Sequence, residues 1–365
     1  MTTIDPITIL YIDDDATELR RIKALLEASG RLRVVAEIPK ASISANIESA
    51  NLPNLFLIDY ELSKIQDDNS SVDYNGTTLS AAIRGVANNW PVVLLSKKSL
   101  IDPGKRHEHL AEFQLIDEII YKDSLGDMDS LIRIVDLIVS LSEGYQRLRD
   151  IVVQSPNWDG VMAALTASPE ETEQLTLANP PLYPQQGRSI WTPSRLADWI
   201  CHTVLEYPGI LYDEVYAATA LRISVESYLS QEVQAVFQSA KYTGVFSSRG
   251  QRWWKQRLER IAIEFVGDLN YADRFAEVFL RKQGIFLSPS VSIVRNESPA
   301  DAVCYIYHKP VMFEYTVAYR PDNRPPIMEP ARLSFKAIQQ SNEFQREFVE
   351  GVDEELLRQI REMDL

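Results

Sequence analysis

Residues 7–15 read ITILYIDDD, and this stretch decides how the first third of the chain folds. The run ITILYID, from Ile7 to Asp13, is largely apolar and stops abruptly at three consecutive acids, the first of which is Asp13. Such a run is typical of a strand buried in a parallel sheet. Leucines and an isoleucine then recur at helical spacing from Leu19 to Leu26, and Gly30 stops that helix. The stretch and its continuation therefore predict one strand–helix unit.

The same alternation repeats four more times along the chain. Further strands are predicted at residues 33–38, 55–59, 91–96 and 117–122, and the helices that follow them at residues 41–50, 76–86, 104–115 and 128–141. Five strand–helix units in succession imply a doubly wound α/β fold with five parallel strands. Ligands of such a sheet lie at the carboxyl ends of the strands.

Polar residues occupy those carboxyl ends. Asp13 and Asp14 close the first strand, and the third, fourth and fifth strands end at Asp59, Ser96 and Lys122. Three carboxylates in one crevice repel one another, so the site needs a cation or a proton at neutral pH. Mg²⁺ held by a few carboxylates is the usual solution. A carboxylate can also attack a phosphoryl group, while a hydroxyl and an ammonium group bind the added oxygens.

Residues 1 to about 142 resemble the receiver domain of two-component response regulators, which has a flavodoxin-like fold. The resemblance rests on the order of the Asp pair in YIDDD, the Asp in LFLIDYEL, the Ser in VVLLSKK and the Lys in IIYKD. It implies that Asp59 is the phosphoacceptor and that Ser96 and Lys122 contact the phosphoryl group. The Mg²⁺ ligands that it implies are Asp13, Asp14, Asp59 and the backbone carbonyl of Glu61. A histidine kinase or phosphotransfer protein would be the donor, and the receiver could form a homodimer.

The chain departs from the receiver pattern at three places. Asp123 stands where the family usually has a proline after the lysine, which commonly sets a cis peptide bond. Ile119 stands where many members place an aromatic switch residue. The loop from Asp59 to Gly76 is long, polar and acidic, and we expect it to lie over the mouth of the site.

Composition limits the other functions. The chain has 365 residues and a formal net charge of -15, which disfavours a broad nucleic-acid or anionic-membrane surface. Two cysteines, Cys201 and Cys304, provide neither a disulfide framework nor a CxxC metal site. The sequence shows neither a signal peptide nor a membrane-spanning run, so we expect a cytoplasmic protein.

The rest of the chain predicts a connector and a second domain. Residues 143–190 are expected to continue the fifth helix and then form a proline-rich linker, and residues 191–365 to form a mostly α-helical α+β output domain of no family that we recognise. Helices are expected at residues 192–207, 212–223, 224–240, 252–266 and 342–365, and β-like runs at 291–294, 302–308 and 312–319. The runs at 302–308 and 312–319 are joined by a short segment around Lys309 and Pro310, and this spacing predicts that they form a hairpin.

We favour a protein-interaction module for this output domain, with an unknown partner protein. A DNA- or RNA-binding regulator is the first alternative, because residues 218–237 resemble a helix-turn-helix and residues 241–260 are basic and aromatic. The nucleic-acid contacts of that alternative would be Arg249, Arg252, Lys255 and Arg257. The simpler interpretation, which we prefer, places Trp253 and Trp254 in the core and pairs the arginines with acids of the same domain. An enzymatic output is the third alternative. It ranks last because the sequence of this domain shows no catalytic signature.

Overall fold

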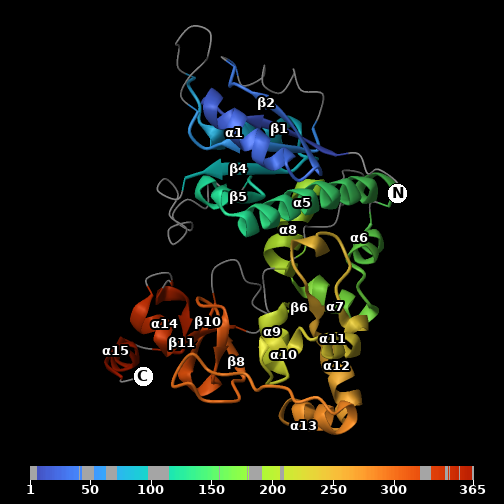
Figure 1. Cartoon of the computed structure of the whole chain (residues 1–365), viewed down its shortest axis with the longest axis vertical. Coiled ribbons are helices and arrows are strands. Elements are labelled where there is room, and N and C mark those ends of the chain that lie inside the picture. The colour runs from blue at the N-terminus through green and yellow to red at the C-terminus, as the bar shows by residue number, and fades with distance from the viewer. Residues whose placement is uncertain are drawn as a thin grey trace. The chain divides into compact units, whose positions relative to one another are not determined.

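The computed structural model (Figure 1) describes residues 6–40, 42, 53–62, 72–97, 115–155, 157–178, 180, 191–205, 209–320, 330–341, 344, 346–352 and 354–363. The chain divides into two compact units. Unit 1 comprises residues 1–164 and 181–199, and unit 2 comprises residues 165–180 and 200–365. The domain boundary predicted at residue 190 falls in a segment outside the described residues.

Unit 1 contains a parallel five-stranded sheet. Its strands are β1 (Ile7–Ile12), β2 (Leu32–Glu37), β3 (Leu55–Asp59), β4 (Val92–Ser96) and β5 (Glu118–Tyr121). Their order is β2-β1-β3-β4-β5, which is the flavodoxin-like order. The central strands β3 and β4 are buried along their whole length, as their apolar sequences predict. The predicted doubly wound sheet is therefore confirmed.

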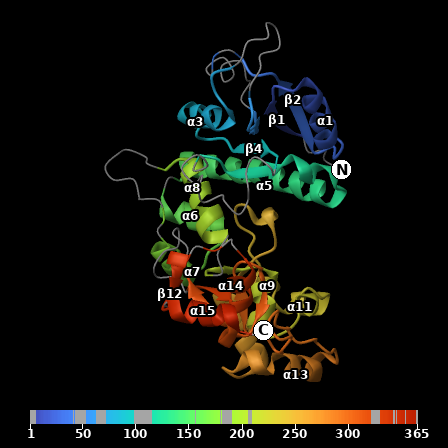
Figure 2. The ribbon, with the colours of Figure 1, turned by 90° about the vertical axis from the view of Figure 1, so that its left-hand side faces the viewer.

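Among the described residues of unit 1, three helices flank this sheet. They are α1 (Ala16–Glu27), α3 (Gly76–Val86) and α5 (Met128–Gln154). α1 and α5 lie on one face of the sheet and α3 lies on the other, as Figure 2 shows. The side chain of Asp15 accepts hydrogen bonds from the backbone N–H groups of Thr17 and Glu18, so it caps α1. The helices predicted at 41–50 and 104–115 lie almost wholly outside the described residues.

Helix α5 continues well beyond the sheet. Its 27 residues include the segment predicted to extend the fifth helix, and Tyr145 and Leu148 in that segment are fully buried. The helix packs against α8 (Pro193–Trp199), which belongs to the same unit. The ring centroid of Trp158 lies 6.0 Å from the ring centroid of Trp191 and 5.6 Å from that of Trp199. These contacts enlarge unit 1 beyond its five-stranded sheet.

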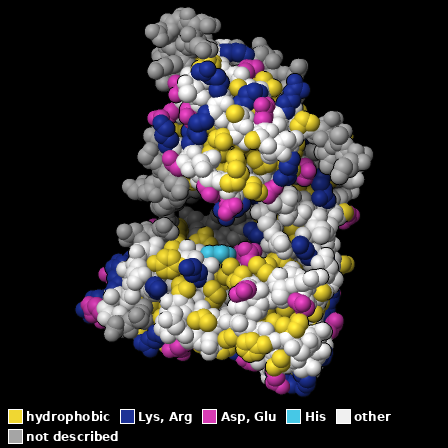
Figure 3. Space-filling model, in the orientation of Figure 1, with side chains coloured by type: hydrophobic (Ala, Val, Ile, Leu, Met, Phe, Trp, Pro, Cys, Tyr) yellow, Lys and Arg dark blue, Asp and Glu magenta, His cyan; other side chains and the backbone are white. Residues whose placement is uncertain are grey.

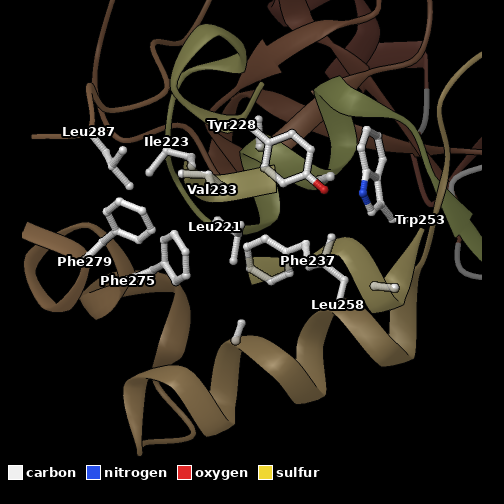
Figure 4. Packing of buried hydrophobic residues seen from close by; sticks show 14 residues of the cluster. Leu221, Ile223, Tyr228, Val233, Phe237, Trp253, Leu258, Phe275, Phe279 and Leu287 are labelled. Atoms are coloured by element: carbon white, nitrogen blue, oxygen red, sulfur yellow. The ribbon is translucent and has the colours of Figure 1, made fainter. Parts of the chain in front are cut away.

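The helical part of unit 2 surrounds an aromatic core (Figure 4). Its elements include α7 (Pro169–Leu177), a π-helix (Ile200–Leu205), β6 (Leu211–Tyr212), α9 (Glu214–Ala220), α10 (Val225–Tyr228), α11 (Gln231–Val236), β7 (Trp253–Trp254), α12 (Lys255–Val266) and α13 (Tyr271–Gln283). The single helix predicted at 224–240 is wrong, because Ser230 begins a new helix. Trp253 and Trp254 pair with β6 instead of opening α12.

A second five-stranded sheet completes unit 2. Its strands are β8 (Ala302–Cys304), β9 (Lys309–Val311), β10 (Thr316–Tyr319), β11 (Ala331–Ser334) and β12 (Val349–Glu350), and α14 (Phe335–Gln340) and α15 (Glu354–Glu362) pack beside it. The hairpin predicted between residues 302–308 and 312–319 is wrong, because β8 pairs with β9, which contains Lys309 and Pro310, whereas β10 pairs with β11 and β12. The strand predicted at 291–294 is wrong, and the last helix begins only at Glu354.

The part of the chain that the structure describes contains no helix long and apolar enough to cross a bilayer.

Candidate functional site

Three carboxylates meet where β1 and β3 end. The two strands run parallel, with Ile12 opposite Ile58, so the residues that follow them emerge side by side. Ligand oxygens of Asp13, Asp14 and Asp59 all lie within 4.8 Å of one another. Asp13 is fully buried and Asp59 is 5% exposed. Two buried carboxylates this close are unstable as a charged pair without a neighbouring cation.

Lys122 supplies positive charge to this crevice. Its Nζ lies 2.9 Å from Asp13 Oδ2 and 2.8 Å from Asp59 Oδ1. Where the receiver pattern has a proline, the chain turns through a 3-10 helix over Lys122–Gly126. Lys122 still reaches both carboxylates, so the substitution of Asp123 for that proline does not remove the lysine from the site.

The charges of these groups depend on one another. Burial and the charge of Asp13 raise the pKa of Asp59 to about 7, although the hydrogen bond from Lys122 opposes the shift. Burial alone would lower the pKa of Lys122, but its hydrogen bonds to Asp59 and Asp13 outweigh that effect and raise it. The lysine therefore stays charged, and the carboxyl group of Asp59 is partly protonated near neutral pH.

Ser96 and Ile119 lie on the neighbouring strands. Ser96 is buried at the end of β4, opposite Tyr121 of β5, and its hydroxyl donates a hydrogen bond of 3.3 Å to the carbonyl oxygen of Lys97. The hydroxyl is thus turned to the main chain. Ile119 is buried in β5, where it packs with Leu94. The structure therefore brings Asp13, Asp14, Asp59 and Lys122 together and leaves Ser96 beside them.

An open pocket of about 640 Å³ gives access to the carboxylates. Its lining residues are Asp13, Asp14, Asp15, Glu18, Arg21, Asp59, Glu61, Lys97, Lys122, Asp123 and Gly126. Seven of these are acids and three are bases, so the pocket attracts cations. Residues 63–71, which include most of the loop expected over its mouth, lie outside the described residues.

Two residues of the site were not predicted from the sequence. Tyr11 is fully buried and donates its hydroxyl to Asp13 Oδ2. A Cβ atom on Gly76 would lie 2.1 Å from the backbone carbonyl oxygen of Asp59, so only glycine fits there. Both carried a signal. Tyr11 precedes Asp13 by two residues, which puts the two side chains on one face of a strand, and Gly76 opens the helix after the acidic loop.

The basic stretch of unit 2 lies largely in contact with its own domain. Trp253 and Trp254 are fully buried, which confirms the core interpretation for the tryptophans. Arg257 lies 2.6 Å from Glu171, and Arg252 donates a hydrogen bond to the Leu205 carbonyl oxygen.

The structure also describes the other predicted nucleic-acid contacts and the segment that resembles a helix-turn-helix. Lys255 Nζ lies 5.6 Å from the centroid of the Tyr212 ring, and Arg249 is partly buried. In the segment that resembles a helix-turn-helix, the second helix, α10, has four residues. Such a helix is much shorter than one that reads a DNA groove, which favours an ordinary helical hairpin. Nucleic-acid binding stays a prediction without direct support.

Comparison with solved structures finds similarity over the N-terminal part of the chain. No protein-family model matches the chain, and neither does any curated protein. A receiver domain protein from Clostridium thermocellum is 21% identical, with 35% of this chain and 93% of that chain covered and a TM-score of 0.26. A putative response regulator from Chloroflexus aurantiacus is 21% identical, with 37% and 99% covered and a TM-score of 0.28.

A structure described as adenylate cyclase from Rhodopirellula baltica is 15% identical, with 41% of this chain and 99% of that chain covered and a TM-score of 0.32. With such low TM-scores, the fold assignment rests on the strand order given above. That order agrees with the resemblance of residues 1–142 to receiver domains.

Proposed function

We propose that the chain is a response regulator of a two-component system, in which Asp59 accepts a phosphoryl group in the presence of Mg²⁺. The observation that carries this proposal is the position of Lys122, whose Nζ lies within 2.9 Å of both Asp13 and Asp59. A lysine placed there is ready to follow oxygens that are added to Asp59. The strand order and the five polar residues at the strand ends also support it.

The donor set at the crevice fits Mg²⁺. Magnesium prefers oxygen ligands and is often held by one or two carboxylates together with phosphate oxygens. Three carboxylates within 4.8 Å of one another supply such ligands. Asp13, Asp14 and Asp59 would hold the ion, with the backbone carbonyl of Glu61 at the edge of the same pocket. When bound, the ion adds positive charge beside the phosphoryl oxygens.

The transfer itself requires one nucleophile. A carboxylate oxygen of Asp59 forms a bond to the phosphorus atom, while the bond from phosphorus to the leaving group breaks and the leaving group keeps the electron pair. The ammonium group of Lys122 pairs with an oxygen of the transferred group. Ser96 contributes when its hydroxyl turns away from the Lys97 carbonyl and donates to another phosphoryl oxygen.

A histidine kinase or a phosphotransfer protein is the proposed donor, and unit 2 is the proposed output module. Met128 and Ile132 lie one helical turn apart on α5 and are 69% and 53% exposed. Figure 3 shows hydrophobic side chains gathered over α5. Exposed apolar side chains at this spacing suit a protein contact, either with an output partner or with the receiver of a second copy.

Mass spectrometry of the intact chain with acetyl phosphate tests the proposal. We expect one phosphoryl group to be added when Mg²⁺ is present and none after chelation with EDTA. Asp59→Asn is expected to abolish the addition, because an amide is not a nucleophile toward phosphorus. The matched control is Asp117→Asn, which alters another buried aspartate of unit 1 outside the pocket and is expected to leave the addition intact. Addition to Asp59→Asn at the wild-type level would refute the proposal.

A further inference from the structure

Asp13 receives more hydrogen bonds than its role as a metal ligand would suggest. Within the described residues, Tyr11 Oη and Lys122 Nζ both donate to its Oδ2 atom, the latter at 2.9 Å. The backbone N–H of Asp15 donates to Oδ1 at 2.8 Å. Asp13 is fully buried, so these three hydrogen bonds contribute strongly to the stability of its negative charge.

The number of lone pairs on the Asp13 carboxylate limits where a cation can bind to it. A carboxylate offers about four lone-pair sites, two on each oxygen. Tyr11 and Lys122 together occupy Oδ2, whereas Asp15 takes one site of Oδ1. The second site on Oδ1 is therefore the position of Asp13 that can take a cation while all three donors stay in place.

We propose that Tyr11 is a positioning residue, which holds Asp13 with Oδ1 toward the metal and keeps Oδ2 satisfied when Lys122 moves to the phosphoryl group. This inference rests on the proposed function. It adds a role for a strand residue that does not itself touch the metal or the transferred group.

The role of Tyr11 follows from the position of Lys122, which is shared between Asp13 and Asp59. The lysine contacts Asp13 and Asp59 at the same time, so pairing with a newly added phosphoryl group draws it away from Asp13. A buried carboxylate oxygen without a donor is costly. Because Tyr11 donates to the same oxygen, Asp13 Oδ2 keeps a hydrogen bond after the lysine leaves. In Tyr11→Phe, Lys122 is the one remaining donor to Asp13 Oδ2, so a movement of the lysine turns the carboxylate away from the metal.

A double-mutant cycle tests this idea in the full chain. Mg²⁺ affinity is measured by calorimetry for the wild type, Tyr11→Phe, Lys122→Met and the double variant. We expect Tyr11→Phe to weaken binding by about tenfold when Lys122 is present. In the Lys122→Met background the same change should cost less than about threefold, because no ammonium group then pulls Asp13 away from the metal. Equal losses in the two backgrounds, or no loss in either, would overturn the inference.

Tyr145 provides a matched control. It is also a fully buried tyrosine of unit 1, and its hydroxyl donates to Asp117, which precedes β5 whereas Lys122 follows it. Both Tyr→Phe variants should lower the melting temperature of the metal-free chain, but only Tyr11→Phe should reduce the further rise that Mg²⁺ causes. A reduction of the same size in Tyr145→Phe would also overturn the inference. If the wild type binds no Mg²⁺ at all, the proposed function falls together with it.

Discussion

Asp13 and Asp59 are buried carboxylates that share the ammonium group of Lys122. That arrangement leaves the crevice with a surplus of negative charge. Burial and, after it, the charge of Asp13 raise the pKa of Asp59 to about 7. A proton and a divalent cation are therefore alternative ways to balance the same charge. Competition between them makes the affinity for Mg²⁺ depend on pH.

The direction of that dependence can be worked out. The carboxyl group of Asp59 is largely protonated below about pH 7 in the metal-free site, and Mg²⁺ must displace the proton. Apparent affinity should fall by up to about tenfold per pH unit below 7 and level off above it. Calorimetric titrations at several pH values measure this, and Asp59→Asn should flatten the profile. A flat profile in the wild type would show that Asp59 does not titrate there.

The same shift affects the stability of the metal-free chain. Because the pKa of Asp59 is raised from 3.8 to about 7 on folding, the native state binds more protons than the unfolded state between those values. This group's contribution to stability is therefore present below about pH 4 and is lost as the pH rises through 7. Bound Mg²⁺ would restore it, since the cation replaces the proton.

At the residue scale, the sequence predicted the groups that carry charge and missed the groups that arrange them. Asp13, Asp59 and Lys122 stand at the ends of apolar strands, where their polarity is conspicuous. Tyr11 lies inside such a run and looks like an ordinary core residue. The signal for its hydrogen bond to Asp13 was the spacing of two residues along the strand, which many core residues share.

Helix α3 shows how an element secures the end of β3. Gly76 opens the helix, and its N–H donates to the carbonyl oxygen of Tyr60 at 3.0 Å. Its α-carbon lies against the backbone of Asp59, with space for no side chain. The close approach therefore fixes the end of β3, which carries the proposed phosphoacceptor Asp59.

A pair of glycine substitutions in α3 tests this contact. Gly76→Ala should destabilise the chain by about 1–3 kcal/mol, because the new methyl group displaces the backbone of Asp59. The same displacement should slow the phosphorylation of Asp59. Gly85→Ala lies in the same helix with nothing within 4 Å of the added Cβ. It should stabilise the chain by about 0.5–1 kcal/mol and leave phosphorylation unchanged. Chemical denaturation and the rate of mass gain measure the two effects, and equal rates in both variants would contradict this account.

The elements of unit 1 were predictable because each strand is an apolar run with a polar end. The observed bounds of β1, β3 and β4 agree with the predicted ones within one residue. Unit 2 offered weaker patterns. Residues 224–240 have helical composition throughout, yet Ser224 and Ser230 each begin a separate short helix. The pairing of β6 with β7 joins residues about forty positions apart, and no local pattern announces such a contact.

On the scale of the whole chain, a change at Asp59 must reach the rest of unit 1 through elements that contact the site. Lys122 opens a 3-10 helix that leads at once into α5. Near its other end, α5 is anchored by Tyr145, whose hydroxyl donates to Asp117, which also pairs with the buried Arg84. A shift of Lys122 toward a phosphoryl group should therefore move the first turns of α5 more than its anchored part.

Hydrogen exchange measures that difference. Beryllofluoride with Mg²⁺, which mimics the phosphorylated state, should change protection in residues 122–135 and leave residues 145–154 nearly unchanged. The change should be partial, because Ile119 offers less side-chain movement than an aromatic switch residue would. Protection changes confined to the immediate surroundings of Asp59 would show that the signal does not travel along α5.

The central claim is that a phosphoryl group is carried by Asp59 itself, and locating the modified residue tests it most directly. Borohydride reduction after treatment with acetyl phosphate and Mg²⁺ converts a phosphorylated aspartate to homoserine, which peptide mass spectrometry can place in the sequence. We predict homoserine at position 59 and unmodified aspartate at positions 13 and 14. Homoserine at another position, or none after Mg²⁺-dependent treatment, would contradict the account.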